Sequence, residues 1–179
     1  MKYSILTLFL FITFKLFSQE EEKKSLIGDF TQFEISVPLR VNQNDEEILS
    51  DSSSNDDWFV PDGINGNFGY GIHFNKWIGL SANTGIGMKV SKELFMTPLF
   101  VNFRLMPKAG IENRVGIDVG LGKTFALGRG NLTGDFKRIK VVFESDEIQF
   151  FIEAINYGIT LRNESQIASL SLGISLINF

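Results

Sequence analysis

The stretch "GYGIHFNKWIGLSANTGIGM", residues 69–88, alternates large apolar residues with small or polar ones in two runs that meet at Asn75 and Lys76. In the first run, Ile72 and Phe74 share one parity, while glycine, histidine and asparagine take the other. Because successive side chains of a β-strand point to opposite faces, this pattern predicts two strands joined by a turn. Soluble sheets and membrane barrels both alternate in this way, so the composition of the two faces decides between them.

The same alternation recurs along the chain and predicts eight strands. We expect them at residues 30–40, 64–75, 76–88, 97–106, 113–126, 136–144, 148–162 and 165–177. The 179 residues include 18 phenylalanines and 17 glycines against 4 prolines, a balance that favours an all-β protein. An even number of strands suits an antiparallel up-and-down barrel with both chain ends on one side.

The two faces of the predicted strands differ in the size of their side chains. One face carries phenylalanine, isoleucine, leucine and valine, and the other is mostly glycine, serine and asparagine. A soluble sheet usually places lysine, glutamate, threonine and arginine on its wet face, whereas small polar residues fit the narrow lumen of an eight-stranded barrel. We therefore predict an eight-stranded antiparallel transmembrane β-barrel. The alternative is a soluble lipocalin-like carrier with its apolar face inside.

The first 18 residues have the features of a secretory signal peptide. An apolar run at 3–14 follows a lysine, and Ser18 offers a small residue at the cleavage site. The run is shorter than the roughly 20 residues of a transmembrane helix. We expect a signal peptide at 1–18, a periplasmic segment at 19–27 and an outer-membrane barrel at 28–179.

Charge and composition exclude several classes of partner and site. The formal net charge of −4 becomes −6 when Lys2 and Lys15 leave with the signal peptide, so nucleic acid is not an expected partner. The absence of cysteine excludes disulfides, thiolate metal sites and a lipid anchor on an N-terminal cysteine. One histidine is present, without a Ser-His-Asp order, a metal-ligand cluster or a phosphate loop. We expect no enzyme activity, no cofactor and no metal site.

Three further stretches carry a family resemblance: "TPLFVNFRLMP" (97–107), "VGIDVGLGKTFAL" (115–127) and "SLSLGISLINF" (169–179). With them, the chain resembles the small outer-membrane β-barrel family of Gram-negative bacteria, the OmpA/OmpX-like eight-stranded barrels. The resemblance implies an outer-membrane location among lipids and lipopolysaccharide. It also implies assembly by the barrel-assembly machinery, for which a terminal aromatic residue is the signal. Phe179 matches that signal, although Ser175 lies where the family pattern has an apolar residue.

Charged and polar side chains on the lumen parity form a candidate site. They are Glu34, Arg40, His73, Arg104 and Asp118. Charges inside a barrel need partners or water, so we expect Glu34 to pair with Arg104, and Asp118 to pair with Arg104 or Arg40. The cluster is either an ion path or a polar plug that satisfies itself. The narrow lumen of eight strands favours the plug.

Glu153 conflicts with the alternation around it. In the segment at 148–162, Phe151 and Ile155 share parity with Glu153, so a strand that turned them to lipid would turn the glutamate there too. A charged side chain facing lipid near the membrane centre is destabilising. We predict a β-bulge at Glu153 and Ala154, which would reset the parity and point Glu153 into the lumen.

The segment at 41–63 is expected to be a long external loop without lysine or arginine. Its acidic residues are Asp45, Glu46, Glu47, Asp51, Asp56, Asp57 and Asp62. Asp56 stands where a calcium-binding loop has its turn glycine, so we expect a solvated surface loop that contacts divalent ions bridging lipopolysaccharide.

These features predict an outer-membrane barrel with a polar, mostly closed lumen. Its role would be structural, in the cell envelope, or in surface contacts made by its external loops. The main alternative is a narrow ion or small-solute channel. A soluble carrier and a lipid A-modifying enzyme are further alternatives, and the sequence identifies no external partner.

Overall fold

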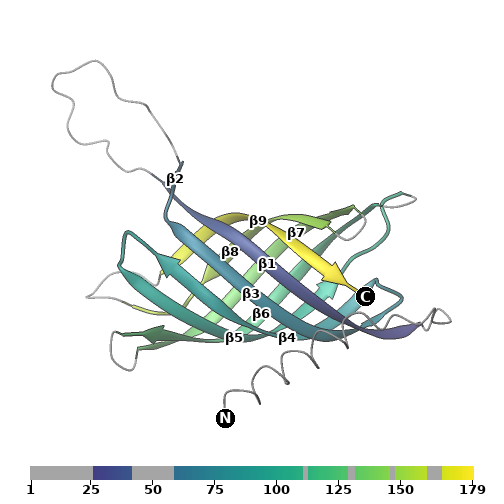
Figure 1. Ribbon diagram of the computed structural model, residues 1–179, viewed down its shortest axis with the longest axis horizontal. Helices are drawn as coiled ribbons and strands as arrows, with labels where there is room; N and C mark the ends of the chain where they lie inside the picture. The colour runs from purple at the N-terminus through teal and green to yellow at the C-terminus, as the bar shows by residue number, and fades with distance from the viewer. Residues whose placement is uncertain (1–25, 42–58, 111–112, 129–131, 146–147, 161–166) are drawn as a thin grey trace, which may run out of the picture.

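The computed structural model describes residues 26–41, 59–110, 113–128, 132–145, 148–160 and 167–179, which form an antiparallel β-barrel (Figure 1). The strands are β1 (Ile27–Val41), β2 (Phe59–Pro61), β3 (Gly63–Phe74), β4 (Ile78–Lys89), β5 (Leu94–Leu105), β6 (Asn113–Leu127), β7 (Thr133–Ser145), β8 (Ile148–Asn156) and β9 (Ala168–Asn178). The eight long strands pair in sequence order, and β9 pairs with β1 to close the barrel. The predicted fold class is confirmed. In this described part of the chain, no helix has the length and apolar character to cross a membrane.

The extra strand β2 continues β3 beyond an irregular step at Asp62. Between Ser36 and Leu39, β1 advances three residues, while its partner advances four, from Asn65 to Pro61. One extra residue on one side of an antiparallel pair is a β-bulge, which bends the strand and changes its twist. The bulge lies between β3 and β2 near one end of the barrel, where β1 still pairs with β9 as far as Leu39.

The two ends of the barrel have different connections. We call the end where β1 begins and β9 finishes the terminal end, and the opposite end the loop end. At the terminal end, Asn75 and Lys76 have φ of 50° and 56°, and the Trp77 N–H donates to Phe74 O at 2.9 Å. Positive φ at both central residues is the geometry of a type I′ hairpin turn. The turn predicted at this pair is confirmed.

At the loop end, four strand boundaries differ from the prediction by three residues or more. β7 begins at Thr133 rather than at 136, and β9 begins at Ala168 rather than at 165. β5 begins at Leu94 rather than at 97, so a short turn at 90–93 joins it to β4. β8 finishes at Asn156 rather than at 162. The Asn156 side-chain oxygen accepts a hydrogen bond from the N–H of Gly158 at 2.8 Å, and Gly158 has a φ of +66°. This local turn ends the strand early and directs the chain back toward the lumen.

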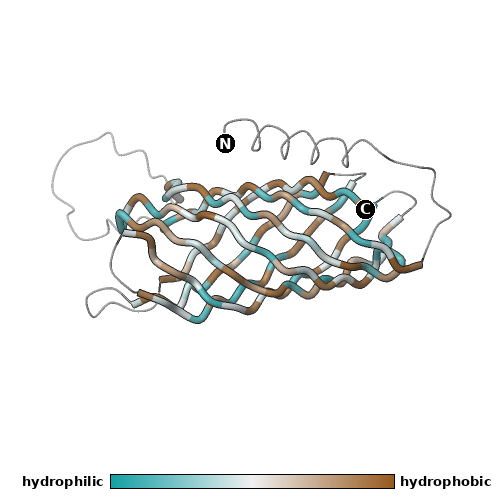
Figure 2. The backbone as a smooth tube through the Cα atoms, turned by 60° about the horizontal axis from the view of Figure 1, so that its bottom comes forward, coloured by the Kyte–Doolittle hydropathy of each residue, from teal (hydrophilic) through white to brown (hydrophobic). Residues whose placement is uncertain are grey.

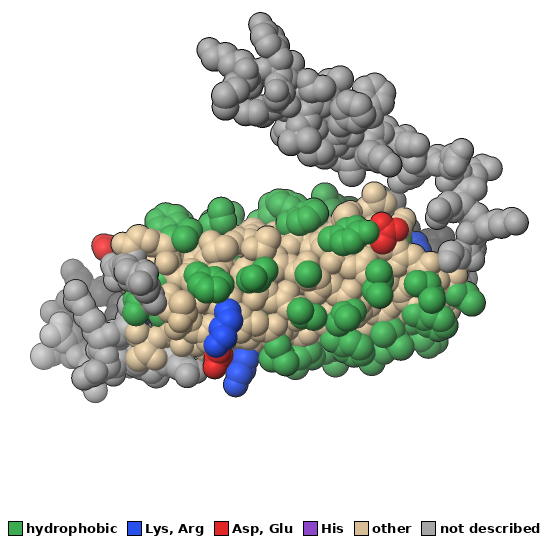
Figure 3. Space-filling model, turned by 90° about the horizontal axis from the view of Figure 1, so that it is seen from below, with side chains coloured by type: hydrophobic (Ala, Val, Ile, Leu, Met, Phe, Trp, Pro, Cys, Tyr) green, Lys and Arg blue, Asp and Glu red, His purple; other side chains and the backbone are tan. Residues whose placement is uncertain are grey.

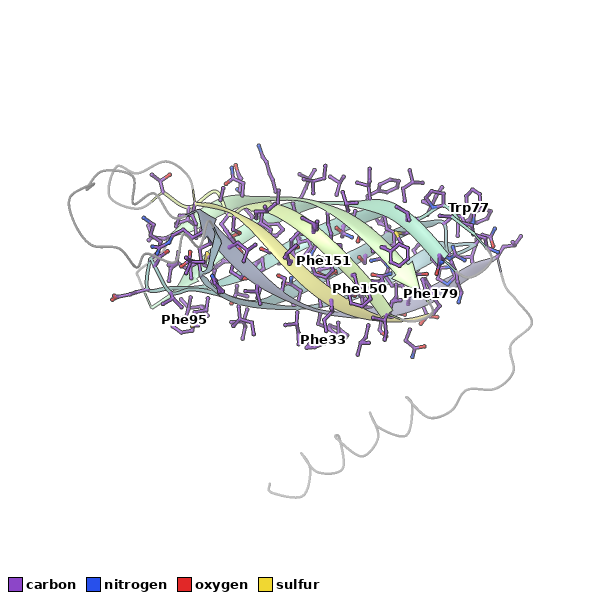
Figure 4. All side chains as sticks on the ribbon, turned by 90° about the horizontal axis from the view of Figure 1, so that it is seen from above. Phe33, Trp77, Phe95, Phe150, Phe151 and Phe179 are labelled. Atoms are coloured by element: carbon purple, nitrogen blue, oxygen red, sulfur yellow. The ribbon has the colours of Figure 1, made fainter. Side chains whose placement is uncertain are left out.

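Side chains alternate between the outside and the lumen along every long strand. Hydrophobic and hydrophilic residues alternate along the tube in Figure 2. Phe150 and Phe151 are neighbours on β8, yet Phe150 is 55 % exposed on the outer wall and Phe151 is 4 % exposed in the interior. Phe33 and Phe95 also project outward (Figure 4). A soluble carrier would need the opposite arrangement, with these large apolar side chains inside.

The lumen is not polar along its whole length, which corrects the prediction. An apolar plug fills its loop end and consists of Leu94, Met96, Phe100, Phe136, Ile155, Tyr157, Ile159 and Ile167. Tyr157, Ile159 and Ile167 come from the chain between β8 and β9. Backbone hydrogen bonds join Tyr157 to Ile167 and Ile167 to Ile159, at 2.9 and 3.0 Å. Because β8 ends early, the chain that follows it contributes Tyr157, Ile159 and Ile167 to the apolar plug.

Candidate functional site in the barrel lumen

Six charged side chains meet in the middle of the lumen, and each is at most 3 % exposed. This central cluster consists of Glu34, Arg104, Asp118, Arg138, Lys140 and Glu153. They project from β1, β5, β6, β7 and β8, at positions whose parity faces inward. Three acidic and three basic groups give the cluster a formal charge of zero.

Glu34 accepts hydrogen bonds from two cations of β7. Arg138 Nη1 lies 2.6 Å from Glu34 Oε2, and Lys140 Nζ lies 2.5 Å from Glu34 Oε1. β1 and β7 are not neighbours in the sheet, because β8 and β9 lie between them. These ion pairs therefore cross the lumen and connect two parts of the wall that share no backbone ladder.

Asp118 is the second acidic centre. Arg104 donates to both of its carboxylate oxygens, from Nε at 3.1 Å and from Nη2 at 2.9 Å. A bidentate pair of this kind is among the strongest hydrogen-bonded ion pairs in proteins. Lys140 Nζ lies 3.0 Å from Asp118 Oδ2, so this lysine bridges Asp118 and Glu34.

Glu153 is the third acidic group, and it faces the lumen without a bulge. Its Oε1 accepts a hydrogen bond from Ser36 Oγ at 2.6 Å, and its Oε2 lies 3.6 Å from Arg138 Nη1. β8 pairs with β7 in one register from end to end, so the predicted bulge at Glu153 and Ala154 is wrong. The reason is that Phe151 faces the lumen together with Glu153. The strand therefore alternates regularly, and no extra residue is needed to turn Glu153 inward.

Amide side chains connect the charged groups. Gln32 accepts a hydrogen bond from Arg104 Nη2 at 2.8 Å and donates one to Glu34. Gln149 accepts from the same Arg104 nitrogen at 3.3 Å and donates to Glu144 at 2.5 Å. Since each amide has both a donor and an acceptor, it links groups of opposite charge without adding charge of its own.

The structure brings together four of the residues expected in the lumen and separates two others. Glu34, Arg104, Asp118 and Glu153 belong to the central cluster. Arg104 pairs with Asp118 as expected, but Glu34 pairs with the cations of β7 and reaches Arg104 only through Gln32. Arg40 was placed wrongly: it is exposed, because β1 has left the barrel wall at that point and pairs with β2.

Arg138 and Lys140 are the functional residues that the sequence interpretation missed. The segment at 136–144 shows Ile139, Val141 and Phe143 on one parity, and all three face outward. Their parity alone assigns Arg138 and Lys140 to the lumen. The same alternation that predicts this strand therefore also points Arg138 and Lys140 into the lumen.

His73 lies at the terminal end, away from the central cluster, and contacts the last residue of the chain. The rings of His73 and Phe179 meet edge to face, with centroids 4.9 Å apart, and the Phe30 ring lies 5.8 Å from that of Phe179. Lys76 Nζ lies 4.4 Å from the centre of the Phe179 ring. The inward and outward positions of β9 alternate regularly to its end. The ring of Phe179 therefore packs at the mouth of the lumen.

Asp62 is the member of the acidic loop that lies in the described residues, and it is buried rather than solvated. Its carboxylate accepts hydrogen bonds from the N–H and the hydroxyl of Ser91, both at 2.8 Å, and lies 3.7 Å from Lys89 Nζ. Asp62 therefore connects the turn at 90–93 to the rim of the barrel through these hydrogen bonds. The other acidic residues of the loop, Asp45, Glu46, Glu47, Asp51, Asp56 and Asp57, lie outside the described residues, as do the proposed signal peptide and its cleavage site.

The central cluster is suited to holding the wall together rather than to binding a metal. Every carboxylate in it has at least one cationic neighbour within 4 Å, so its charge is already compensated. Within the described ranges, no group of three or more histidine, aspartate or glutamate side chains is placed to hold a metal ion.

Comparisons with known proteins place the fold. No protein-family model and no curated sequence matches the chain. Among solved structures, Neisserial surface protein A (NspA) is similar with a TM-score of 0.56 and 9 % identity, over 84 % of this chain and 97 % of that chain. The Yersinia pestis outer membrane protein Ail in a phospholipid bilayer nanodisc has a TM-score of 0.47, 10 % identity, and coverage of 84 % and 100 %. A designed transmembrane β-barrel has a TM-score of 0.45, 9 % identity, and coverage of 88 % and 100 %.

At this identity the likeness to NspA establishes a shared fold and says nothing of a shared activity. The described strands add what the likeness alone does not, namely an apolar outer wall and a lumen filled by a neutral charge cluster. The chain therefore shares the fold of NspA, which here is all-β, antiparallel, eight-stranded and closed.

Proposed function

We propose that the protein is an exported outer-membrane barrel that does not conduct ions, and that it acts in envelope structure and in contacts made at its loop end. The observation that carries this proposal is the central cluster. Its three acidic and three basic groups neutralise one another across the lumen. They leave no continuous path lined by charges of one sign, along which an ion could pass.

Apolar layers on both sides of the central cluster support a closed lumen. Toward the loop end lies the apolar plug, and toward the terminal end Met106, Val142 and Phe151 form a second buried group. A permeating ion would have to shed its water against these side chains, which is energetically unfavourable. A narrow channel is thus the less favoured function.

The outer wall supports a location among membrane lipids. Large apolar side chains cover it on every long strand, and a soluble protein rarely exposes so large an apolar surface. The signal-peptide features at 1–18 favour export, and lipopolysaccharide would then surround the loop end. Phe179 packs at the mouth of the closed barrel, so the assembly machinery would read it before β9 closes onto β1.

Recordings in planar bilayers with the purified full chain test the closed lumen. We expect no steady open level above that of a protein-free bilayer. A steady open level that Arg104→Ala abolishes, and that Lys108→Ala at the exposed terminal end leaves unchanged, would instead establish a narrow channel. Heat-modifiable gel mobility shows in each case that the variant is folded.

Labelling of intact cells tests the location and the orientation. The chain has no cysteine, so a single introduced one is unambiguous. Val90→Cys in the exposed turn at the loop end should react with a membrane-impermeant maleimide, and Lys108→Cys at the terminal end should react only after lysis. Reaction of Lys108→Cys alone in intact cells would contradict the proposed orientation.

A further inference from the structure

The outer wall near the loop end of β6 and β7 carries charges where other strands carry apolar side chains. On β3, outward positions from Ile64 to Phe74 hold apolar residues or glycine, over about 34 Å at roughly 3.4 Å per residue. On β7, the apolar outward positions run only from Ile139 to Phe143, about 14 Å. A membrane barrel needs an apolar band about 25 Å tall, so the band is locally short on β7.

Three charged residues occupy the place of the missing apolar side chains, and we call them the outer lysine patch: Lys123, Asp135 and Lys137. Lys123 and Asp135 are opposite one another on β6 and β7, and their side chains form an ion pair. Lys137 is two residues beyond Asp135 on the same face, opposite Leu121. Residues on neighbouring strands that are offset by two positions on one face lie about 7–8 Å apart. The side chains of Lys123 and Lys137 can span that distance. The patch carries a formal charge of +1.

The outer lysine patch lies at the edge of the apolar surface: Thr133 follows Asp135 toward the loop end, and Lys137 is opposite Asn156, where β8 ends. Leu121 and Phe125 flank Lys123 on the outer face of β6, and Ile139 follows Lys137 on β7. Figure 3 shows blue and red side chains together on the barrel wall, beside the green apolar surface. The side chains of Lys123 and Asp135 are 63 % and 71 % exposed, so a ligand on the outside can reach them.

We propose that the outer lysine patch binds the phosphate of a lipid headgroup in the leaflet at the loop end. Two ammonium groups supply the donors and the net positive charge that a phosphate requires. Asp135 holds Lys123 in place, and Leu121, Phe125 and Ile139 offer an apolar surface for the acyl chains of the same lipid. This inference rests on the proposed membrane location. It adds a site with a defined ligand chemistry.

Spin-labelled lipids measure the preference directly. The full chain is reconstituted in phosphatidylcholine vesicles that contain a trace of spin-labelled phosphatidylglycerol or phosphatidylcholine, and the motionally restricted fraction of each label is compared. We expect the wild type to prefer the anionic lipid. Each lysine near an anionic surface contributes about fivefold, so Lys123→Gln/Lys137→Gln should lose most of that preference.

The matched control is Lys76→Gln/Lys108→Gln, which removes the same charge from exposed residues at the terminal end. It should retain most of the preference. An equal loss in both double variants, or no loss in either, would overturn the inference. Inorganic phosphate added in excess over the anionic headgroups should not abolish the preference; complete displacement would indicate a free-phosphate site and would also overturn the inference.

The two proposals fail in distinguishable ways. If the chain does not enter vesicles in its heat-modifiable form, the membrane proposal fails and no lipid preference is measured. If the chain enters them, yet phosphatidylglycerol and phosphatidylcholine are restricted equally, only the headgroup site is refuted.

Discussion

The hairpin of β3 and β4 and the hairpin of β6 and β7 form two walls of the same barrel with different inner and outer faces. The inner face of β3 and β4 holds mostly glycine, serine and asparagine, and its outer face is apolar almost throughout. The inner face of β6 and β7 holds Asp118, Arg138 and Lys140, and its outer face is interrupted by the outer lysine patch.

We call β3 and β4 the thin wall and β6 and β7 the charged wall. The small inner face of the thin wall leaves room for larger lumen side chains on the strands beside it. A Cβ added at Gly79 of β4 would lie 3.3 Å from the ring of Phe30 and 3.6 Å from the Cβ of Arg104. An eight-stranded lumen has little room, so long side chains from one side require small residues on the other. Gly79 of the opening stretch therefore leaves space for Phe30 and for Arg104 of the central cluster.

The largest expected effect comes from removing a cation of the charged wall. Arg138→Ala removes the cation that lies next to Glu34 and Glu153 in a buried site. Breaking a buried ion pair lowers the free energy of unfolding by about 3–5 kcal/mol. Urea unfolding in lipid vesicles, followed by tryptophan fluorescence, measures the loss. Arg40→Ala, at an exposed position of β1, is the control and should change stability by less than about 0.5 kcal/mol. Equal stability of the two variants would mean that Arg138 on β7 does not stabilise the barrel.

A smaller effect is expected from adding volume to the thin wall. A Cβ at Gly71 would lie 2.3 Å from Leu80 O and 2.6 Å from Ser81 Cβ, so Gly71→Ala should cost about 1–3 kcal/mol. Gly66 is on the same strand, and nothing lies within 4 Å of a Cβ there. Gly66→Ala should be neutral or slightly stabilising in the same unfolding assay. The comparison fails if Gly71→Ala is tolerated as well as Gly66→Ala.

The smallest effect concerns one hydrogen bond across the lumen. Tyr157 donates to Asn65 Oδ1 at 3.3 Å and so connects the chain after β8 to β3. Tyr157→Phe should lose about 0.5–1.5 kcal/mol of unfolding free energy. Tyr70 donates to the Asp29 carboxylate on the exposed outer face, at 3.2 Å, so the control Tyr70→Phe removes the same hydroxyl from an exposed contact. A larger loss for Tyr70→Phe would mean that the lumen contact does not stabilise the barrel.

Alternation in the sequence was sufficient to predict the fold class and the strands of the wall, because a period of two fixes which residues share a face. It failed where both parities are apolar. In "FFIEAIN", residues 150–156, Phe150 and Phe151 satisfy either phase, and the wrong choice led to the predicted bulge. The pairing of β8 with β7 decides the phase, and that pairing is a tertiary property.

The partners within the central cluster could not be predicted from the sequence in the same way. Parity assigns a charge to the lumen, but the stagger of the strands decides which charges lie at one height. Glu34 meets Arg138 and Lys140 although more than 100 residues separate them. The apolar plug was missed for a different reason: Leu94 and Met96 lie before the predicted start of their strand, and Tyr157 lies after the observed end of β8.

Photo-crosslinking from lipid tails to the unmodified chain tests the central claim, that the apolar face meets lipid and the charged face fills the lumen. The full chain is reconstituted with a lipid that carries a diazirine on its acyl chain, and the modified residues are mapped by mass spectrometry. The account predicts modification at Phe150, Ile152 and Leu172, with Phe151, Glu153 and Ser171 protected. Modification of the second set with protection of the first would contradict it.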